Sequence, residues 1–143
     1  YRITDLQAAL GISQLRKIDE FIKRRQILAG HYYSLFEGSN LGLPDRSGLK
    51  ESSWHLYVVQ VPAEFRKDIF MFLKESGIYP NVHYIPVHTH PYYNRLGFKR
   101  GDFPVSEKYY AQAISLPMYA TLQDEQQQFV ADKVIEVLKK CSL

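Results

Sequence analysis

Three histidines that lie within eight positions are the clearest candidates for chemistry in this sequence. His83, His88 and His90 belong to the segment VHYIPVHTHPYYNRLGFKRGDFP, residues 82–104. Imidazole is a common zinc ligand, and Asp102 could add a carboxylate if the segment folds back on itself. The spacing H-x4-H-x-H, however, matches no structural zinc pattern, and no cysteine accompanies it. We therefore predict no metal site.

The same segment has the composition of a ligand-binding loop. Its prolines make a long regular helix unfavourable, and loops supply binding residues more often than scaffold elements do. Aromatic faces and neutral or cationic donors come from Tyr84, His88, His90, Tyr92, Tyr93 and Arg95. Such a set suits a sugar or a phosphorylated ligand. The alternative is that these histidines simply lie in a polar, aromatic-rich loop that binds nothing.

No other motif in the sequence indicates catalysis. The chain contains no G-x-G-x-x-G, no G-x-x-x-x-G-K-[ST] and no G-x-S-x-G. Glu107 and Asp124 are predicted near helix N-termini, where a negative charge is favourable. Arg24 and Arg25 are interpreted as surface charges, with an interface role as the alternative. Cys141 is interpreted as a packed residue at a helix end rather than a nucleophile.

The composition is that of an ordinary globular domain. The chain has 143 residues, of which 45% are apolar and 23% charged. A formal net charge of +3 is too small to indicate binding to nucleic acid or to an anionic membrane. One cysteine cannot form an internal disulfide, the apolar runs are too short to span a bilayer, and no signal-peptide pattern is present. These features predict a cytoplasmic protein.

Residues 1–37 are predicted to form one long helix. Thr4 and Gln7 make a capping-box pattern at its start, and from Leu15 onward the apolar residues recur on one face with a period near 3.6. In the first turns the apolar side chains instead point around most of the circumference: Leu6, Ala8, Ala9, Leu10, Ile12 and Leu15. A helix that is apolar all round is normally buried all round. We therefore predict that this end packs against protein outside the chain, which would make the chain a piece of a longer polypeptide.

Residues 38–143 are predicted to form a small domain. After a loop at 38–53 we expect a strand at 54–61, a helix beyond Pro62, an extended segment at 79–87, a helix at 104–113, a strand at 113–117 and a last helix that starts at Thr121. Trp54 is expected to anchor the core where the first strand begins. The fold class is α/β (α+β), a small sheet with helices packed on one face and a long N-terminal helix.

Six segments, taken in order, resemble the C-terminal part of the sugar aminotransferases of the DegT/DnrJ/EryC1/StrS family. They are YRITDLQAALGISQL, RRQILAGHYYSLF, WHLYVVQV, GIYPNVHYIPVHTHPYY, GDFPVSEKYY and ISLPMY. Each segment is modest alone, but the combination is specific and runs through nearly the whole chain. The VHYIPVH…PYY…GDFP version is most similar to the branch of the family that serves pseudaminic acid synthesis. The arabinose-modifying lipid A aminotransferases are a second possibility.

The resemblance implies a longer enzyme of which this chain would be one part. Such an enzyme has the aspartate aminotransferase-like fold, uses pyridoxal 5′-phosphate, and moves an amino group from glutamate to a 4-keto nucleotide sugar. In the family the lysine that holds the cofactor as a Schiff base belongs to the large N-terminal domain. No lysine of this chain has a comparable setting, so the chain alone is expected to be inactive. The family also implies a homodimer whose active sites are completed across subunits.

The resemblance further implies which residues bind ligands. Tyr1 borders the strip that contacts the cofactor phosphate from the neighbouring subunit, and Arg2 could face the partner's active site. The segment from His83 to His90 would lie at the mouth of the site. The expected contacts with the nucleotide sugar are Arg2, His83, Tyr84, His88 and His90. No catalytic residue is predicted in this chain.

Two alternatives remain open from the sequence. A stand-alone carbohydrate-binding or interaction module would fold by itself and bind a sugar nucleotide without any cofactor. A sugar dehydratase of the same family would have histidine in place of the cofactor-binding lysine. The apolar turns between Leu6 and Leu15 count against the module, because they would leave an exposed apolar patch.

Overall fold

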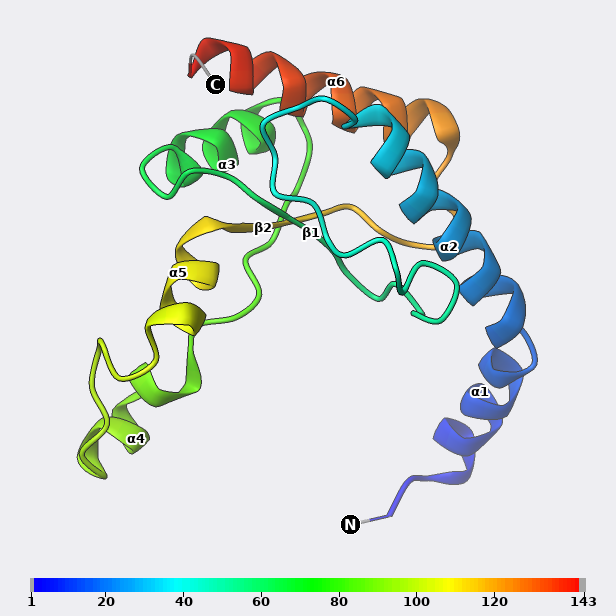
Figure 1. Ribbon diagram of the computed structural model, residues 1–143. Helices are drawn as coiled ribbons and strands as arrows, with labels where there is room; N and C mark the ends of the chain where they lie inside the picture. Colours follow the sequence, from blue (N-terminus) through cyan, green and yellow to red (C-terminus); the bar gives the residue numbers. More distant parts are fainter. Residues whose placement is uncertain (1, 142–143) are drawn as a thin grey trace.

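The computed structural model describes residues 2–141. The chain folds as helices around a two-stranded sheet, in an order that Figure 1 follows from blue to red. The elements are α1 (Asp5–Leu15), α2 (Ile18–Leu35), β1 (Tyr57–Gln60), α3 (Arg66–Glu75), the 3-10 helix η1 (Val87–Thr89), α4 (Pro91–Arg95), α5 (Pro104–Gln112), β2 (Ala113–Leu116) and α6 (Asp124–Lys140). The predicted fold class, a small sheet with packed helices, is confirmed.

The sheet pairs β1 with β2 in antiparallel register. Tyr57 lies opposite Leu116 and Gln60 opposite Ala113, so the two predicted strands form, although each is shorter at its ends than expected. Single-residue bridges extend the sheet on both sides, from Gly42 to β1 and from Asn81 to β2. The segment at 79–87, predicted as an irregular edge strand, therefore meets the sheet at one point. Its prolines lack the N–H groups that a longer ladder requires.

The core lies where α2, α3 and α6 meet the sheet. α6 crosses both α2 and α3, and Figure 1 shows it running over the top of the molecule. Tyr32 of α2 stacks on Tyr57 of β1 with ring centroids 4.8 Å apart, and neither side chain is exposed. Trp54 is buried beside them, and its indole N–H donates to the carbonyl oxygen of Leu49 at 2.9 Å. The prediction that Trp54 anchors the core is confirmed.

The predicted single N-terminal helix is wrong in one respect, because it is interrupted at Arg16 and Lys17. The capping box between Thr4 and Gln7 forms as expected. At the end of α1 the N–H of Lys17 bonds to the carbonyl oxygen of Gln14, a tightened last turn, and a new helix begins at Ile18. Neither interrupting residue is glycine or proline, so the sequence contains no breaker signal there.

α1 buries none of its residues within this chain. Leu6 is 84% exposed, Leu10 63% and Leu15 65%. Figure 1 shows α1 running away from the layer formed by the sheet and α6. The apolar turns that the sequence analysis singled out are thus uncovered in the chain itself.

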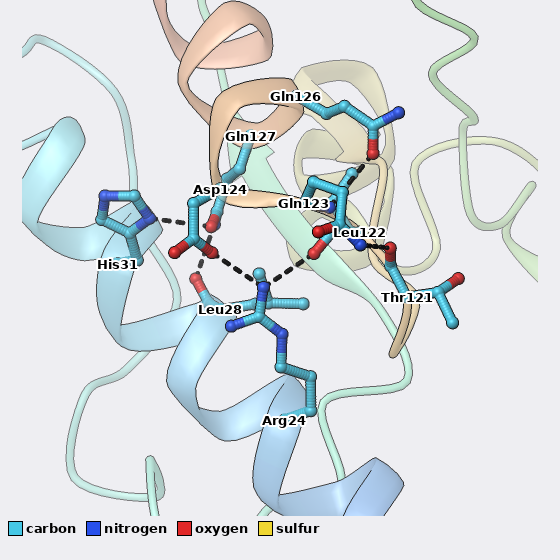
Figure 2. A network of polar contacts seen from close by, with 9 residues as sticks. All are labelled: Arg24, Leu28, His31, Thr121, Leu122, Gln123, Asp124, Gln126 and Gln127. Atoms are coloured by element: carbon cyan, nitrogen blue, oxygen red, sulfur yellow. Dashed lines mark hydrogen bonds and ion pairs between the residues drawn. The ribbon is translucent and has the colours of Figure 1, made fainter.

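A polar network joins the N-terminal end of α6 to α2 (Figure 2). A guanidinium nitrogen of Arg24 donates to the carbonyl oxygen of Leu122 at 2.8 Å and to a carboxylate oxygen of Asp124 at 2.7 Å. The interpretation of Arg24 as a surface charge is corrected by these contacts. They lower the pKa of Asp124, first through the hydrogen bond and then through the charge of the guanidinium. α6 begins later than predicted, because Gln123 rather than Thr121 caps it by exchanging bonds with Gln126.

Candidate functional site

The segment 82–104 forms a projection that we call the aromatic arm. It leaves the sheet beside β2, passes through η1 and α4, and returns to α5, which leads back into β2. Figure 1 shows α4 at the far end of this projection, away from α6. α4 packs on η1, the neighbouring turn of the same arm. The local sequence explains the shape: prolines at 86 and 91 begin short turns, and Gly97 and Gly101 take positive φ angles of 99° and 96°.

The base of the arm is attached to the sheet. Asn81 exchanges two backbone hydrogen bonds with Ser115 of β2, at 3.0 and 2.7 Å. Nδ1 of His83 lies 2.9 Å from the hydroxyl oxygen of the same serine. The ring of Tyr84 lies against the His83 ring, with centroids 4.5 Å apart, and is 71% exposed. His83 therefore attaches the arm to the sheet, and Tyr84 is free to contact a ligand.

His88 is the buried histidine of the arm. It is 7% exposed, its ring lies 4.8 Å from the ring of Phe103, and its Nε2 lies 2.8 Å from Oε1 of Glu107. His88 is thus held on two sides by the return segment of the arm. That surrounding fits a residue that shapes the site, and its predicted contact with substrate stays a prediction.

Glu107 joins two parts of the arm through one oxygen. Its Oε1 accepts the N–H of Gly101 at 2.7 Å in addition to facing His88. The Gly101 hydrogen bond, followed by the one from His88, lowers the pKa of the Glu107 carboxyl. The predicted position of Glu107 near a helix N-terminus is confirmed, because it lies in the first turn of α5. Its two tertiary contacts were not predicted.

Half-exposed rings continue from His88 toward the tip of the arm. Phe103 lies 6.2 Å from Phe98, Phe98 lies 6.3 Å from Tyr93, and Tyr93 lies 5.3 Å from Tyr92, all between ring centroids. These rings and their neighbours border a hollow of about 370 Å³, lined by Val87, His88, Tyr93, Phe98, Phe103 and Ser106. The hollow is mostly apolar, and it has the histidine ring at its edge. Such a surface can stack on a sugar or a base.

His90 faces solvent at the start of α4. It takes the N-cap position, but its side chain makes no capping hydrogen bond. Like Tyr84 and the 61%-exposed Tyr92, it is one of the exposed ring-bearing side chains of the arm. The structure thus separates the four predicted arm residues into two that are held inward, His83 and His88, and two that face outward.

Of the two predicted N-terminal site residues, only Arg2 lies within the described part of the chain. Arg2 is exposed ahead of α1, and Tyr1 lies outside the described residues. Figure 1 shows the N-terminal end and α4 on opposite sides of the molecule.

Two further features bear on cofactors and location. Among residues 2–141, no group of three His, Cys, Asp or Glu side chains is close enough to hold a metal ion. Within the same range, no helix has the length and apolar character needed to cross a membrane.

The sequence as a whole matches an established family. Residues 1–135 match the DegT/DnrJ/EryC1/StrS aminotransferase family. This chain belongs to that family. The family assignment confirms the resemblance that the sequence motifs indicated. Several of these motifs form the aromatic arm and the two strands of the sheet.

Two relatives of this chain carry names that refer to polysaccharide biosynthesis and to a sugar transaminase. The chain is 39% identical over 142 residues to the spore coat polysaccharide biosynthesis protein SpsC of Bacillus subtilis, a match that covers 94% of this chain and 36% of SpsC. It is 30% identical over 149 residues to the UDP-4-amino-4,6-dideoxy-N-acetyl-beta-L-altrosamine transaminase of Campylobacter jejuni, covering 98% of this chain and 38% of that enzyme. The chain therefore spans little more than a third of the relatives it matches.

Solved structures show the same fold in aminotransferases. The PLP-form of the putative sugar aminotransferase Spr1654 of Streptococcus pneumoniae aligns with a TM-score of 0.90 and 31% identity, over 97% of this chain and 36% of that chain. PseC of Helicobacter pylori, an aminotransferase of pseudaminic acid biosynthesis, aligns with a TM-score of 0.88 and 32% identity. The alignment covers 98% of this chain and 38% of PseC. The fold is that of the C-terminal part of these enzymes.

Sequence reasoning missed the residues that hold the arm in place. In the sequence, Ser115 is typical of an ordinary position in a buried strand, and Gly101 is typical of a turn residue. Their bonds to His83 and Glu107 span 32 and 6 positions, respectively. No local pattern marks contacts of this kind.

Proposed function

We propose that this chain is the C-terminal domain of a pyridoxal 5′-phosphate-dependent aminotransferase that acts on a nucleotide sugar. One observation supports this above the rest: 97% of the chain superposes on the PLP-form of a putative sugar aminotransferase with a TM-score of 0.90. In the proposed reaction, glutamate donates the amino group and a 4-keto nucleotide sugar receives it. The proposal places the enzyme in the cytoplasm.

The cofactor itself does not fit the described residues of this chain. A Schiff-base lysine requires a pocket that lowers its pKa, usually through desolvation. Lys133 is half-buried and pairs with Glu136, and the other nine lysines are exposed. Under the proposal, the lysine therefore comes from the rest of a longer enzyme. This chain alone would be inactive, as expected from the sequence.

The role proposed for this chain is to contact the sugar nucleotide with the aromatic arm. Tyr84 and His90 are the exposed residues among the four predicted arm residues, and we assign the direct contacts to them first. His83 and His88 shape the arm from within. Arg2 would act at the active site of a partner subunit, and Tyr1 at the cofactor phosphate, across a homodimer.

The same proposal gives the exposed turns of α1 a partner. Leu6, Leu10 and Leu15 would be covered by the large domain or by the second subunit, close to the dimer interface. Residues 1–37 would then connect the domains, and residues 38–143 would form the small domain. The substrate assigned first is the 4-keto sugar of pseudaminic acid synthesis, because three such transaminases match, two at 30% and one at 32% identity.

The test uses the longer protein that contains this chain. Glutamate alone should convert its bound cofactor to the amine form, visible as a change in absorbance. 15N-labelled glutamate should then transfer its nitrogen to a UDP-linked 4-keto-6-deoxy sugar, detected by mass spectrometry. A sugar product that has lost water and gained no nitrogen would favour the dehydratase. Tight binding of UDP-N-acetylglucosamine by the 143-residue chain, with no cofactor anywhere in the longer protein, would favour the stand-alone module.

A further inference from the structure

One carboxylate oxygen of α5 connects two separate parts of the aromatic arm. Oε1 of Glu107, in the first turn of α5, accepts the N–H of Gly101 at 2.7 Å and lies 2.8 Å from Nε2 of His88 in η1. The side chain of His88 is 8% exposed and that of Glu107 is 26% exposed. The pair is thus partly shielded from water, where a charged hydrogen bond is stronger than on an open surface.

Apart from Glu107, the part of the chain between these two contacts is held by hydrogen bonds and ring contacts within the arm itself. α4 has five residues, too few for a helix to be stable by itself, and it packs on η1 of the same arm. The aromatic side chains of this segment are half-exposed: Tyr93 of α4 is 37% exposed and Phe98 40%. By fixing His88 at one end and Gly101 at the other, Glu107 closes the loop that contains His90 and Tyr92. Closing that loop reduces the number of conformations open to the residues in it.

A favourable charge at a helix N-terminus does not explain these contacts. Helix-dipole stabilisation requires only that an acidic side chain lies in the first turn. Glu107 instead reaches a backbone N–H six positions away and an imidazole 19 positions away. At Gly101 the backbone has a φ of +96°, a region that side-chain-bearing residues rarely adopt, and this conformation presents its N–H to the carboxylate.

We propose that Glu107 is a positioning residue for the ligand-binding surface of the arm. It does not contact the ligand; it holds His88 and Gly101 so that His90 and the ring of Tyr92, which lie between them, are ordered before the ligand arrives. Ordering these groups in advance removes part of the entropy cost of binding. The identity of the ligand, a nucleotide sugar, rests on the proposed function. The positioning role itself rests on the contacts within the chain.

The first test follows hydrogen exchange in the 143-residue chain by mass spectrometry. Glu107→Ala should accelerate exchange in peptides that cover residues 87–103 by about tenfold, since charged hydrogen bonds of this kind are lost. Glu107→Gln, whose amide oxygen can still accept from Gly101, should accelerate it less. Peptides from α3 and α6 should be unchanged in both variants. Glu75→Ala, at an exposed glutamate in the last turn of α3, is the matched control and should leave the arm unaffected.

Unchanged exchange at 87–103 in the Glu107→Ala chain would overturn the proposal. Equal acceleration in the arm and in α6 would overturn it as well, because Glu107 would then support the fold in general rather than the arm.

The second test measures steady-state kinetics in the longer enzyme. Glu107→Ala should raise KM for the nucleotide sugar by about tenfold, as expected for a lost charged hydrogen bond. The rate of the half-reaction with glutamate should stay within about twofold of the wild-type rate, because the arm takes no part in binding glutamate under this proposal. Equal losses in both half-reactions would contradict the positioning role. A wild-type enzyme that transfers no nitrogen would contradict the proposed function instead, and the exchange experiment would still decide the role of Glu107.

Discussion

The side-chain amide of Gln127 donates a hydrogen bond to the carbonyl oxygen of Leu28 at 2.7 Å, across 99 positions of the chain. Gln127 is fully buried between α6 and α2, and its Oε1 lies 2.9 Å from Nδ1 of His31 (Figure 2). Both ends of a buried amide are therefore paired. A buried polar group that is fully paired fixes how two helices lie against each other, because any shift would leave it unpaired.

Removing this amide should destabilise the fold. We expect Gln127→Ala to lower the free energy of unfolding by about 2–3 kcal/mol, from the lost hydrogen bonds and the cavity left behind. The neighbouring Gln128→Ala is the matched control, because Gln128 is exposed and its side-chain amide donates to Asp132, one turn away on the same helix. Gln128→Ala should change the free energy of unfolding by no more than about 0.5 kcal/mol. Urea unfolding followed by circular dichroism measures both, and similar losses in the two variants would contradict the role given to Gln127.

Two buried tyrosines should respond differently to loss of the hydroxyl group. The hydroxyl of Tyr57 is buried with no hydrogen-bond partner among the described residues, whereas that of Tyr32 donates to the carbonyl oxygen of Pro117 at 3.0 Å. Burial raises the pKa of both hydroxyls, so both stay neutral at ordinary pH. Tyr32→Phe should therefore cost about 1 kcal/mol of unfolding free energy, and Tyr57→Phe should cost nothing or add stability. Urea titrations that showed the larger loss for Tyr57→Phe would refute this assignment.

Stability should fall in acid partly through Glu136. Hydrogen bonds from Lys133 and then Lys140 lower the pKa of Glu136 to about 2. A carboxyl with a folded-state pKa below its unfolded value of about 4.3 stabilises the fold above that value and loses this effect as the pH falls toward the folded value. The difference in urea midpoint between wild type and Glu136→Gln should thus be largest near neutrality and shrink between about pH 4.3 and pH 2.

The side chain of Glu136 is 39% exposed, so added salt should reduce this difference. Glu75→Gln, an exposed glutamate with no ion pair within residues 2–141, serves as the control. A midpoint difference that stays constant from pH 7 to pH 2 would show that the ion pairs of Glu136 do not stabilise the fold.

The exposed face of the arm should contribute to binding of the nucleotide sugar. In the longer enzyme, Tyr84→Ala should raise KM for that substrate by about three- to tenfold, the range expected for loss of one stacked ring. The rate of the half-reaction with glutamate should be unchanged. Tyr79→Ala is a close control, because Tyr79 is 73% exposed against 71% for Tyr84 but precedes the arm. Should Tyr79→Ala raise KM as much as Tyr84→Ala, the arm would not be the binding surface.

The uncovered side chains of α1 should make the isolated 143-residue chain associate with itself. Leu6 and Leu10 are 84% and 63% exposed, and exposed apolar patches of this kind favour protein contacts. Sedimentation velocity should show dimers or larger species for the wild-type chain and mostly monomer for the double variant Leu6→Gln/Leu10→Gln. Val105→Gln, at a residue that is 83% exposed outside α1, should leave the association unchanged. A monomeric wild-type chain would instead favour the stand-alone module.

Local signals in the sequence were enough for most of the elements. The capping box at Thr4 and Gln7 depends on two side chains three positions apart, and it forms as predicted. The strand at Tyr57–Gln60 follows from a run of aromatic and β-branched residues, which fit a pleated surface in many contexts. The break at Arg16 and Lys17 could not be predicted, because the apolar pattern runs through it and no helix-breaking residue stands there.

The amino-acid sequence by itself determined the family, the small sheet with its helices, and the segment in which a ligand site would lie. These depend on residue types and short spacings, which are properties of the chain before it folds. Only the tertiary structure decided which histidine of that segment is buried, which faces solvent, and that Glu107 and Ser115 hold two of them. The contacts of His88 and His83 reach 19 and 32 positions along the chain. Contacts at such separations exist only once the sheet and α5 have brought those residues together.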